Sequence, residues 1–256
     1  MKKLNCFLVV LALFVSFSCK KSDNQSTSNS SGNCKLLKSM ESSSNFSCNY
    51  NDDNTISTVM FVPSPGDTAW DHYYYENGHV SYMIRLMQGA KADTATYFWS
   101  GGKYTEGHQY GSVYKYSYDN GGNLIKLSIN TDPQHNDYCD FTYDDKGNCI
   151  AFNKYYYSDS SYFLAESTVL EYGDHKNPYS SIGLPPPNSM SYVTGQYRSN
   201  NNIIKITDHI IGNPVMTFVF VYSYSTFNDN GYPLYVTTSD TLGHPLSYET
   251  LNYKCP

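Results

Sequence analysis

The stretch Tyr118-Asp119-Asn120-Gly121-Gly122-Asn123-Leu124-Ile125-Lys126-Leu127 decides the fold, because a similar stretch, Tyr143-Asp144-Asp145-Lys146-Gly147-Asn148-Cys149-Ile150-Ala151-Phe152, follows it. In both copies, apolar and polar residues alternate on either side of a segment rich in Asp, Asn and Gly. Asn, Asp and Gly tolerate positive φ, and Asx side chains close their own turns. Each copy is therefore typical of an antiparallel β-hairpin with one apolar face and one polar face.

The register of these hairpins can be predicted from the turn segments. If residues 119–122 and 144–147 form four-residue loops, Tyr116 faces Ile125 and Tyr114 faces Leu127, on one apolar face. In the second copy, the same rule places Phe141 opposite Ile150 and Cys139 opposite Phe152. The opposite face then carries the polar residues Lys115, Ser117, Lys126, Asp140 and Thr142. This register puts Cys139 and Cys149 on different faces and predicts that they do not bond to each other.

Weaker copies of the turn recur along the chain. They are Tyr50–Asn54, Tyr75–Gly78, Trp99–Lys103, Tyr172–Asn177, Tyr197–Asn202 and Phe227–Gly231. Spacings near 25 residues indicate a meandering repeat, and sustained helical periodicity is missing. We therefore predict an all-β fold for residues 34–256, an antiparallel up-and-down meander of about a dozen or more strands. The sheet should be strongly curved or barrel-like, and an open or a closed form is equally compatible with the pattern. Pro185-Pro186-Pro187 predicts an excursion over residues 177–191.

The N-terminus has the pattern of an export signal. Lys2 and Lys3 precede the apolar run 4–17, which is too short for a spanning helix. Ser18-Cys19 at the end of this run resembles a bacterial lipobox, although Ser16 stands where Leu is usual. The resemblance implies a signal peptide over residues 1–18 and a lipid on Cys19. Residues 19–33 then form a polar tether without large apolar side chains after Cys19.

Four segments carry a further resemblance: Tyr143–Asn148, Lys176–Tyr179, Asn201–Thr207 and Asn230–Leu234. Tyr143–Asn148 looks like the YD repeat of Rhs-type and teneurin-type proteins. Together the four segments resemble a family of secreted Bacteroidetes lipoproteins of unknown function with YD-like repeats. This resemblance implies a β-hairpin fold and an envelope location, and it implies no reaction. The irregular spacing departs from the tight arrays of Rhs proteins.

The composition narrows the classes of partner and compartment. The formal net charge is −6, and no basic stripe is present, which argues against a nucleic-acid partner. The chain contains 27 Tyr, a residue that suits half-exposed strands. Five cysteines follow Cys19, namely Cys34, Cys48, Cys139, Cys149 and Cys255. They allow at most two disulfides, and their pairing remains open at this point.

The sequence contains no motif for catalysis, for a metal or for another cofactor. The seven His are scattered, and neither a nucleophile elbow nor a phosphate loop occurs. Asp52-Asp53, Asp144-Asp145 and Asn228–Asn230 could ligate Ca²⁺, but turn chemistry is the favoured interpretation. Glu166 and Glu171 have opposite strand parity, which argues against a shared catalytic face. The aromatic runs supply candidate ligand-binding residues, Tyr74, Trp99 and Tyr156, whose outward rings could stack on a sugar or a protein.

These observations favour a non-catalytic, lipid-anchored envelope protein that binds a glycan or a protein partner. Its membrane contact would be the lipid on Cys19, in the outer membrane, with the cell-surface side slightly favoured over the periplasmic side. An integral outer-membrane β-barrel is the alternative, although Tyr, Lys and Asp on both faces argue against it. A glycan-active hydrolase with dispersed carboxylates is a further, weaker alternative.

Overall fold

The computed structural model describes residues 34–41, 45–64, 67–132, 135–180, 182, 184–186, 199–212 and 214–255. The predicted signal peptide, Cys19 and tether lie outside these residues. Strands account for most of the described chain, and the described residues form no helix. The strands are β1 Lys35–Glu41, β2 Asn45–Tyr50, β3 Ile56–Ser64, β4 Asp67–Glu76, β5 His79–Met87, β6 Ala90–Ser100, β7 Lys103–Gln109, β8 Ser112–Tyr118, β9 Leu124–Asp132, β10 His135–Tyr143, β11 Cys149–Ser158, β12 Ser161–Lys176, β13 Asn201–Ile210, β14 Met216–Phe227, β15 Pro233–Ser239 and β16 Pro245–Lys254.

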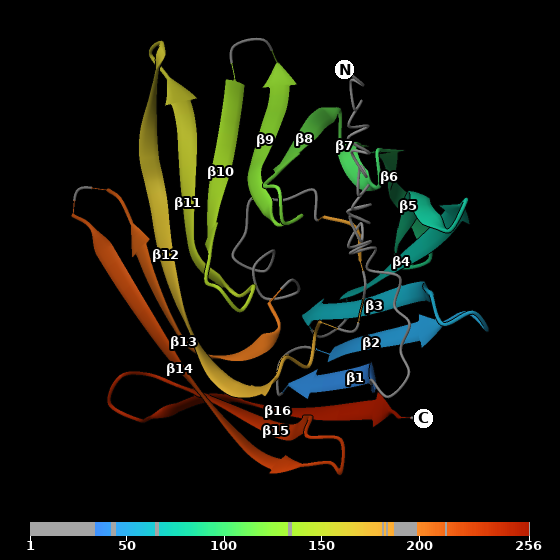
Figure 1. The fold of residues 1–256 in the computed structure, drawn as a ribbon, viewed down its shortest axis with the longest axis vertical. Helices are drawn as coiled ribbons and strands as arrows, with labels where there is room; N and C mark the ends of the chain where they lie inside the picture. Colours follow the sequence, from blue (N-terminus) through green and yellow to red (C-terminus); the bar gives the residue numbers. More distant parts are fainter. Residues whose placement is uncertain are drawn as a thin grey trace, which may run out of the picture.

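The strands form one closed antiparallel barrel in which each strand pairs with the next and β1 pairs with β16 (Figure 1). The β1–β16 seam runs from Lys35 opposite Lys254 to Glu41 opposite Glu249. A disulfide between Cys34 and Cys255 fastens this seam. The prediction of an all-β meander is confirmed, and closure removes the exposed sheet edges that an open meander would leave.

The two ends of the barrel differ, and we name them by what they carry. The disulfide end contains the Cys34–Cys255 bond and the connections that follow the even-numbered strands from β2 to β14. The distal end contains the connections that follow the odd-numbered strands from β1 to β15. Each strand thus has a half near the disulfide end and a half near the distal end.

One turn geometry recurs and explains the sequence repeat. In the turn after β8, the Asp119 amide donates to the Asn123 carbonyl at 3.0 Å, and the Gly122 amide donates to the Asp119 carbonyl. The Asp119 carboxylate also accepts from the amide of Asn123 at 2.8 Å. The same backbone pair of bonds closes the turns that begin at Asn51, Asp144, Asn228 and Asp240. The fourth turn residue has positive φ, +92° at Gly122 and +80° at Gly147, which explains the Gly at this position.

This turn contains five residues, so the predicted four-residue loop and its register are wrong. Tyr118 pairs with Leu124, a bulge follows, and Tyr116 pairs with Leu127 instead of Ile125. Tyr116 faces the core, whereas Ile125 is 38% exposed on the other side. In the second copy, Phe141 pairs with Phe152 instead of Ile150. The bulge supplies the extra residue that a five-residue closure requires.

Beyond the residue beside each turn, the predicted faces are correct. Tyr114, Tyr116, Leu127, Phe141 and Phe152 are buried in one core cluster. Cys149 also enters this cluster, because the bulge turns it inward together with Cys139. The predicted opposite faces of these two cysteines are therefore wrong. They are nevertheless unbonded, and Cys48 is the third free thiol among the described residues.

Tyrosines stabilise the disulfide end in a repeated way. The hydroxyl of Tyr143, at the end of β10, donates to the carbonyl of Leu124, at the start of β9, at 3.0 Å. Equivalent bonds join Tyr50 to Leu36, Tyr75 to Ile56, Tyr172 to Cys149, Tyr224 to Ile203 and Tyr253 to Pro233. Each ring packs inside the barrel while its hydroxyl satisfies a backbone carbonyl, which explains much of the tyrosine content.

The chain between β12 and β13 enters the barrel, as the gold segments inside the ring show in Figure 1. Ile182 is buried against Leu36, Val59 and other residues of the disulfide half. The Tyr116 hydroxyl donates to the Pro186 carbonyl at 3.4 Å. The predicted excursion over residues 177–191 is therefore seen in its described part, and it lies within the ring of strands.

Candidate functional site

Polar side chains form a belt on the inner wall, on the distal side of the apolar core. They face inward because they alternate with outward residues in the register of the barrel. We call this set the inner polar belt. It consists of Ser39, Asp71, Arg85, Asp93, Gln109, Ser112, Asp137, Lys154, Glu166, Asp208, Thr238 and Glu249.

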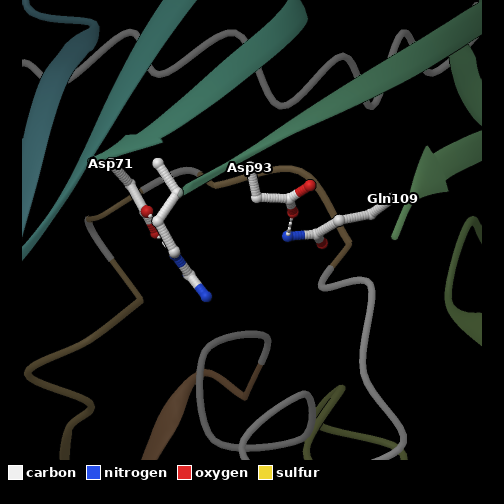
Figure 2. A network of polar contacts seen from close by, with 4 residues as sticks. Asp71, Asp93 and Gln109 are labelled. Carbon is white, nitrogen blue, oxygen red and sulfur yellow. Dashed lines mark hydrogen bonds and ion pairs between the residues drawn. The ribbon is translucent and has the colours of Figure 1, made fainter. Parts of the chain in front are cut away.

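The first part of the belt comes from β4 to β7. The Arg85 guanidinium donates from Nε to Asp71 Oδ1 and from Nη2 to Asp71 Oδ2, both at 2.7 Å. The Asp71 side chain is only 3% exposed, so this bidentate pair neutralises a buried carboxylate. Beside it, Gln109 Nε2 donates to Asp93 Oδ2 at 2.6 Å. Figure 2 shows Asp71, Asp93 and Gln109, which come from β4, β6 and β7.

The second part of the belt comes from β10 to β13. Lys154 Nζ lies 3.7 Å from Glu166 Oε2, and both side chains are mostly buried. Thr168 Oγ1 donates to Asp208 Oδ1 at 3.0 Å, on the strand next to Glu166. The Tyr157 amide donates to Asp137 Oδ1 at 2.9 Å. The three carboxylates thus lie on successive or nearby strands of one inner face.

Glu249 completes the belt at the barrel seam. Its carboxylate accepts hydrogen bonds from the hydroxyls of Ser39 and Tyr179. Tyr179 belongs to the segment that enters the barrel, so the belt also holds that segment in place. Taken together, the belt contains more carboxylates than cations, because Arg85 and Lys154 stand among the acidic residues Asp71, Asp93, Asp137, Glu166, Asp208 and Glu249.

The acidic turn segments are part of the fold and not part of the belt. Hydrogen bonds from the Asn123 side chain and amide hold the pKa of the Asp119 carboxyl below its usual range. Asp144 accepts in the same way from the amides of Lys146 and Asn148. Within the described part of the chain, no three His, Cys, Asp or Glu side chains form a metal-binding group. The hydrogen bonds give these aspartates a role in closing their own turns.

The outer wall differs between the two halves of the barrel. The outward side chains of the distal half include Met60, Val62, Trp70, Ile84, Leu86, Val113, Tyr138, Tyr155, Leu164, Val219, Leu246 and Tyr248. Of the described outward strand positions in this half, Lys91 beside the β5–β6 turn is the charged one.

Charged outward side chains lie at mid-strand or in the disulfide half. They include Lys38, Glu76, Glu106, Lys115, Lys126, Asp140, Glu171, Lys205 and Lys254. Several are already paired, as in the 2.7 Å contact of Lys205 with Glu171. Apart from Lys91, the outer wall is thus uncharged where the inner wall is polar, and it is charged where the inner wall is apolar.

The structure places the predicted ligand-binding aromatics apart. Tyr74 on β4 is 40% exposed on the outer wall and stacks on Tyr82 at 4.4 Å. Trp99 on β6 is near the disulfide end and stacks on His79 at 3.5 Å. Trp99 also packs edge-on against Tyr104, a ring that contacts the core. Its register matches that of the inward Tyr97 and not that of the outward Phe98, so Tyr74 and Trp99 do not share one face. Tyr156 is on β11, far around the barrel from both. It shares the inward parity of Phe152 and Lys154, and Lys154 Nζ lies 5.0 Å from its ring centre, so its ring does not have the expected outward direction.

The sequence analysis did not identify the residues of the inner polar belt as a site. A usable signal was present, because Asp71 and Arg85 are single charges between the apolar or aromatic neighbours Trp70, Ile84 and Leu86. Such a charge predicts an inner polar wall only when the sheet is known to close. Glu166 faces inward and Glu171 faces outward, so their predicted opposite faces are confirmed.

Comparison with known proteins leads to the fold and not to a family. No protein-family model and no curated protein matches the sequence. Solved structures do match, including a porin-like protein from Bacteroides uniformis, with a TM-score of 0.51 and 11% identity, covering 87% of this chain and 96% of that one. A porin-like protein from Bacteroides vulgatus has a TM-score of 0.47 and 12% identity, covering 87% of this chain and 99% of that one. In the described residues, no helix has the length and apolar character to cross a membrane.

Proposed function

We propose that this chain is a non-catalytic β-barrel protein of the bacterial outer membrane, with an inner polar belt that contacts hydrophilic solutes. The observation that carries the proposal is the polarity of the distal half. Trp70, Ile84 and Leu86 face outward there, while Asp71 and Arg85 alternate with them and face inward. Apolar-out and polar-in alternation is the arrangement of barrels that contact lipid outside and water inside.

The structural comparison supports this proposal through the fold. The Bacteroides uniformis protein is described as porin-like, and the alignment spans most of both chains. The identity of 11% limits the likeness to the barrel itself. The assignment to the outer membrane therefore rests on the charge pattern of the wall, together with the export signal predicted for residues 1–18.

A second candidate function is a lipid-tethered binding barrel in the aqueous phase, held by the lipid predicted on Cys19. The disulfide half favours it, because Lys115, Lys126 and Asp140 face outward there and Leu127 and Phe141 are buried inside. This is the polarity of a water-soluble barrel. Its partner would be a glycan or an envelope protein, held by exposed aromatics such as Tyr74 and Trp99.

Sodium carbonate washing of membranes from cells that produce a Cys19→Ala variant separates the two candidates. An inserted barrel stays in the membrane pellet without its lipid, whereas a tethered barrel moves to the supernatant. Cys6→Ala is the matched control, because it removes a cysteine from the apolar run and leaves the predicted lipid site intact. Labelled palmitate should enter the wild type and the control but not Cys19→Ala. Release of the Cys19→Ala chain would overturn the proposal.

A further inference from the structure

The lipid contact suggested by the distal half has a definable edge. On β4 and β5, Tyr74 and Tyr82 stack on the outer wall, two and three residues from the ends of their strands at the disulfide end. On the distal side of this pair, the outer wall continues with His72 opposite Ile84 and then with Trp70 opposite Leu86. Tyrosine at the boundary of an apolar band is typical of the interface between hydrocarbon and water.

The opposite flank shows the same edge through its charges. Lys126 on β9 and Asp140 on β10 face outward on neighbouring strands. On their distal side, the outer wall carries Tyr138 stacked on Tyr155 at 4.6 Å. Lys126 Nζ lies 3.7 Å from the centre of the Tyr138 ring. The outward side chains on this flank therefore change from charged to aromatic between these two contacting residues. Charges on the lipid face are costly at mid-bilayer depth and tolerated near the interface.

The uncharged band is too short for a full bilayer. On β5 it extends from Tyr82 to Met87, which ends the strand. Six residues at about 3.3 Å each, tilted by about 45°, cover about 14 Å along the barrel axis. A typical outer-membrane barrel has an apolar band about 25 Å tall.

We infer that the lipid boundary crosses this barrel at mid-height, so that the distal half is embedded and the disulfide half stands in water. The inference rests on the proposed outer-membrane location and adds the depth and direction of insertion. It explains why the disulfide half has an apolar core and a charged exterior. It also places the inner polar belt at the level of the embedded half.

The chain supplies its own probes for this test, because it has two tryptophans, one on each side of the boundary. Trp70 pairs with Met60 and Leu86 in the distal half, and Trp99 lies beside the β6–β7 turn at the disulfide end. The full chain is reconstituted into liposomes as Trp99→Phe, which leaves Trp70 as the fluorescent tryptophan, and as Trp70→Phe, which leaves Trp99. Fluorescence is measured with acyl-chain-brominated lipids and with aqueous iodide.

The expected result is that Trp70 is quenched by brominated lipids and protected from iodide, and that Trp99 behaves in the opposite way. Quenching of both tryptophans by brominated lipids would overturn the mid-height boundary and leave the outer-membrane proposal standing. Quenching of neither by brominated lipids would overturn both. Circular dichroism of each variant verifies the β fold. Trp99→Tyr and Trp70→Tyr, which also keep an aromatic ring at each position, provide a second pair of variants for the same quenching measurement.

A charge scan on one strand gives an independent readout. Val219 and Ser225 both face outward from β14, Val219 in the distal half and Ser225 in the disulfide half. Val219→Lys is expected to raise the fraction of chain that fails to float with liposomes by about tenfold, and Ser225→Lys is expected to leave it unchanged. Equal effects of the two substitutions would contradict the boundary.

Discussion

Cys34 and Cys255 form a disulfide across 221 residues of sequence, at the point where the first and last strands meet. The bond closes nearly the whole described chain into one loop, and β1 pairs with β16 beside it. Cross-linking distant residues restricts the unfolded chain more than cross-linking near ones.

Removing this bond is expected to destabilise the barrel. Cys34→Ser with Cys255→Ser should lower the free energy of unfolding by about 2–5 kcal/mol, measured by denaturant titration. Addition of a reductant should lower the stability of the wild type to that of the double variant and leave the double variant unaffected. An unchanged midpoint in the double variant would show that strand pairing alone holds the seam.

Arg85 should be required for stability because it neutralises the buried carboxylate of Asp71. Arg85→Ala leaves the buried Asp71 carboxylate without its bidentate cation, which is expected to cost about 3–5 kcal/mol. Replacing both residues, as Asp71→Leu with Arg85→Met, should restore most of the loss. The matched control is Lys205→Ala, which breaks the half-exposed pair with Glu171 and should cost less than about 1 kcal/mol. Equal losses in the two single variants would contradict the burial argument.

The tyrosine hydroxyls at the disulfide end should contribute measurably. Tyr143→Phe keeps the ring and removes the donor to the Leu124 carbonyl, so stability should fall by about 1–2 kcal/mol. Tyr74→Phe is the control, because that ring lies on the outer wall and stacks on Tyr82. Its stability should match that of the wild type. An unchanged stability of Tyr143→Phe would mean that water satisfies the Leu124 carbonyl equally well.

The turn aspartates predict a pH dependence. Because the hydrogen bonds from Asn123 lower the pKa of Asp119 in the folded chain, this group stabilises the fold above the unfolded pKa of about 3.9. The contribution is lost as the pH falls through the folded pKa. Asp119→Asn should therefore be less stable than the wild type at pH 7 and equal to it near pH 2. Asn already occupies the equivalent position at Asn51 and Asn228, so the variant should fold. A difference that persists in acid would contradict this assignment.

The sequence predicted the hairpins well because their information is local. Alternation in Tyr114–Tyr118 and the Asx-Gly turns specify strand faces without knowledge of the rest of the chain. The error lay in turn length, since the Asp119 side chain and backbone both close on Asn123. One extra residue in the turn moved Leu124 inward and Ile125 outward, and did the same for Cys149 and Ile150.

The remaining features depend on contacts between distant residues. Pairing of β1 with β16, the burial of Ile182 inside the ring and the inner polar belt all require the closed barrel. Among the binding candidates, Tyr74 faces outward, Trp99 packs against His79 and Tyr104 at the disulfide end, and Tyr156 lies elsewhere around the barrel. The lipid on Cys19 and the likeness to YD-repeat lipoproteins stay predictions, because residue 19 lies outside the described residues and no family model matches.

The central claim is that this barrel inserts into a lipid bilayer through its own wall. Flotation of the purified Cys19→Ala chain with liposomes on a density gradient tests it most directly. The account predicts that the chain rises with the lipid and stays bound through a wash in high salt. A chain that remains at the bottom of the gradient would contradict the claim and favour a tethered, water-soluble barrel.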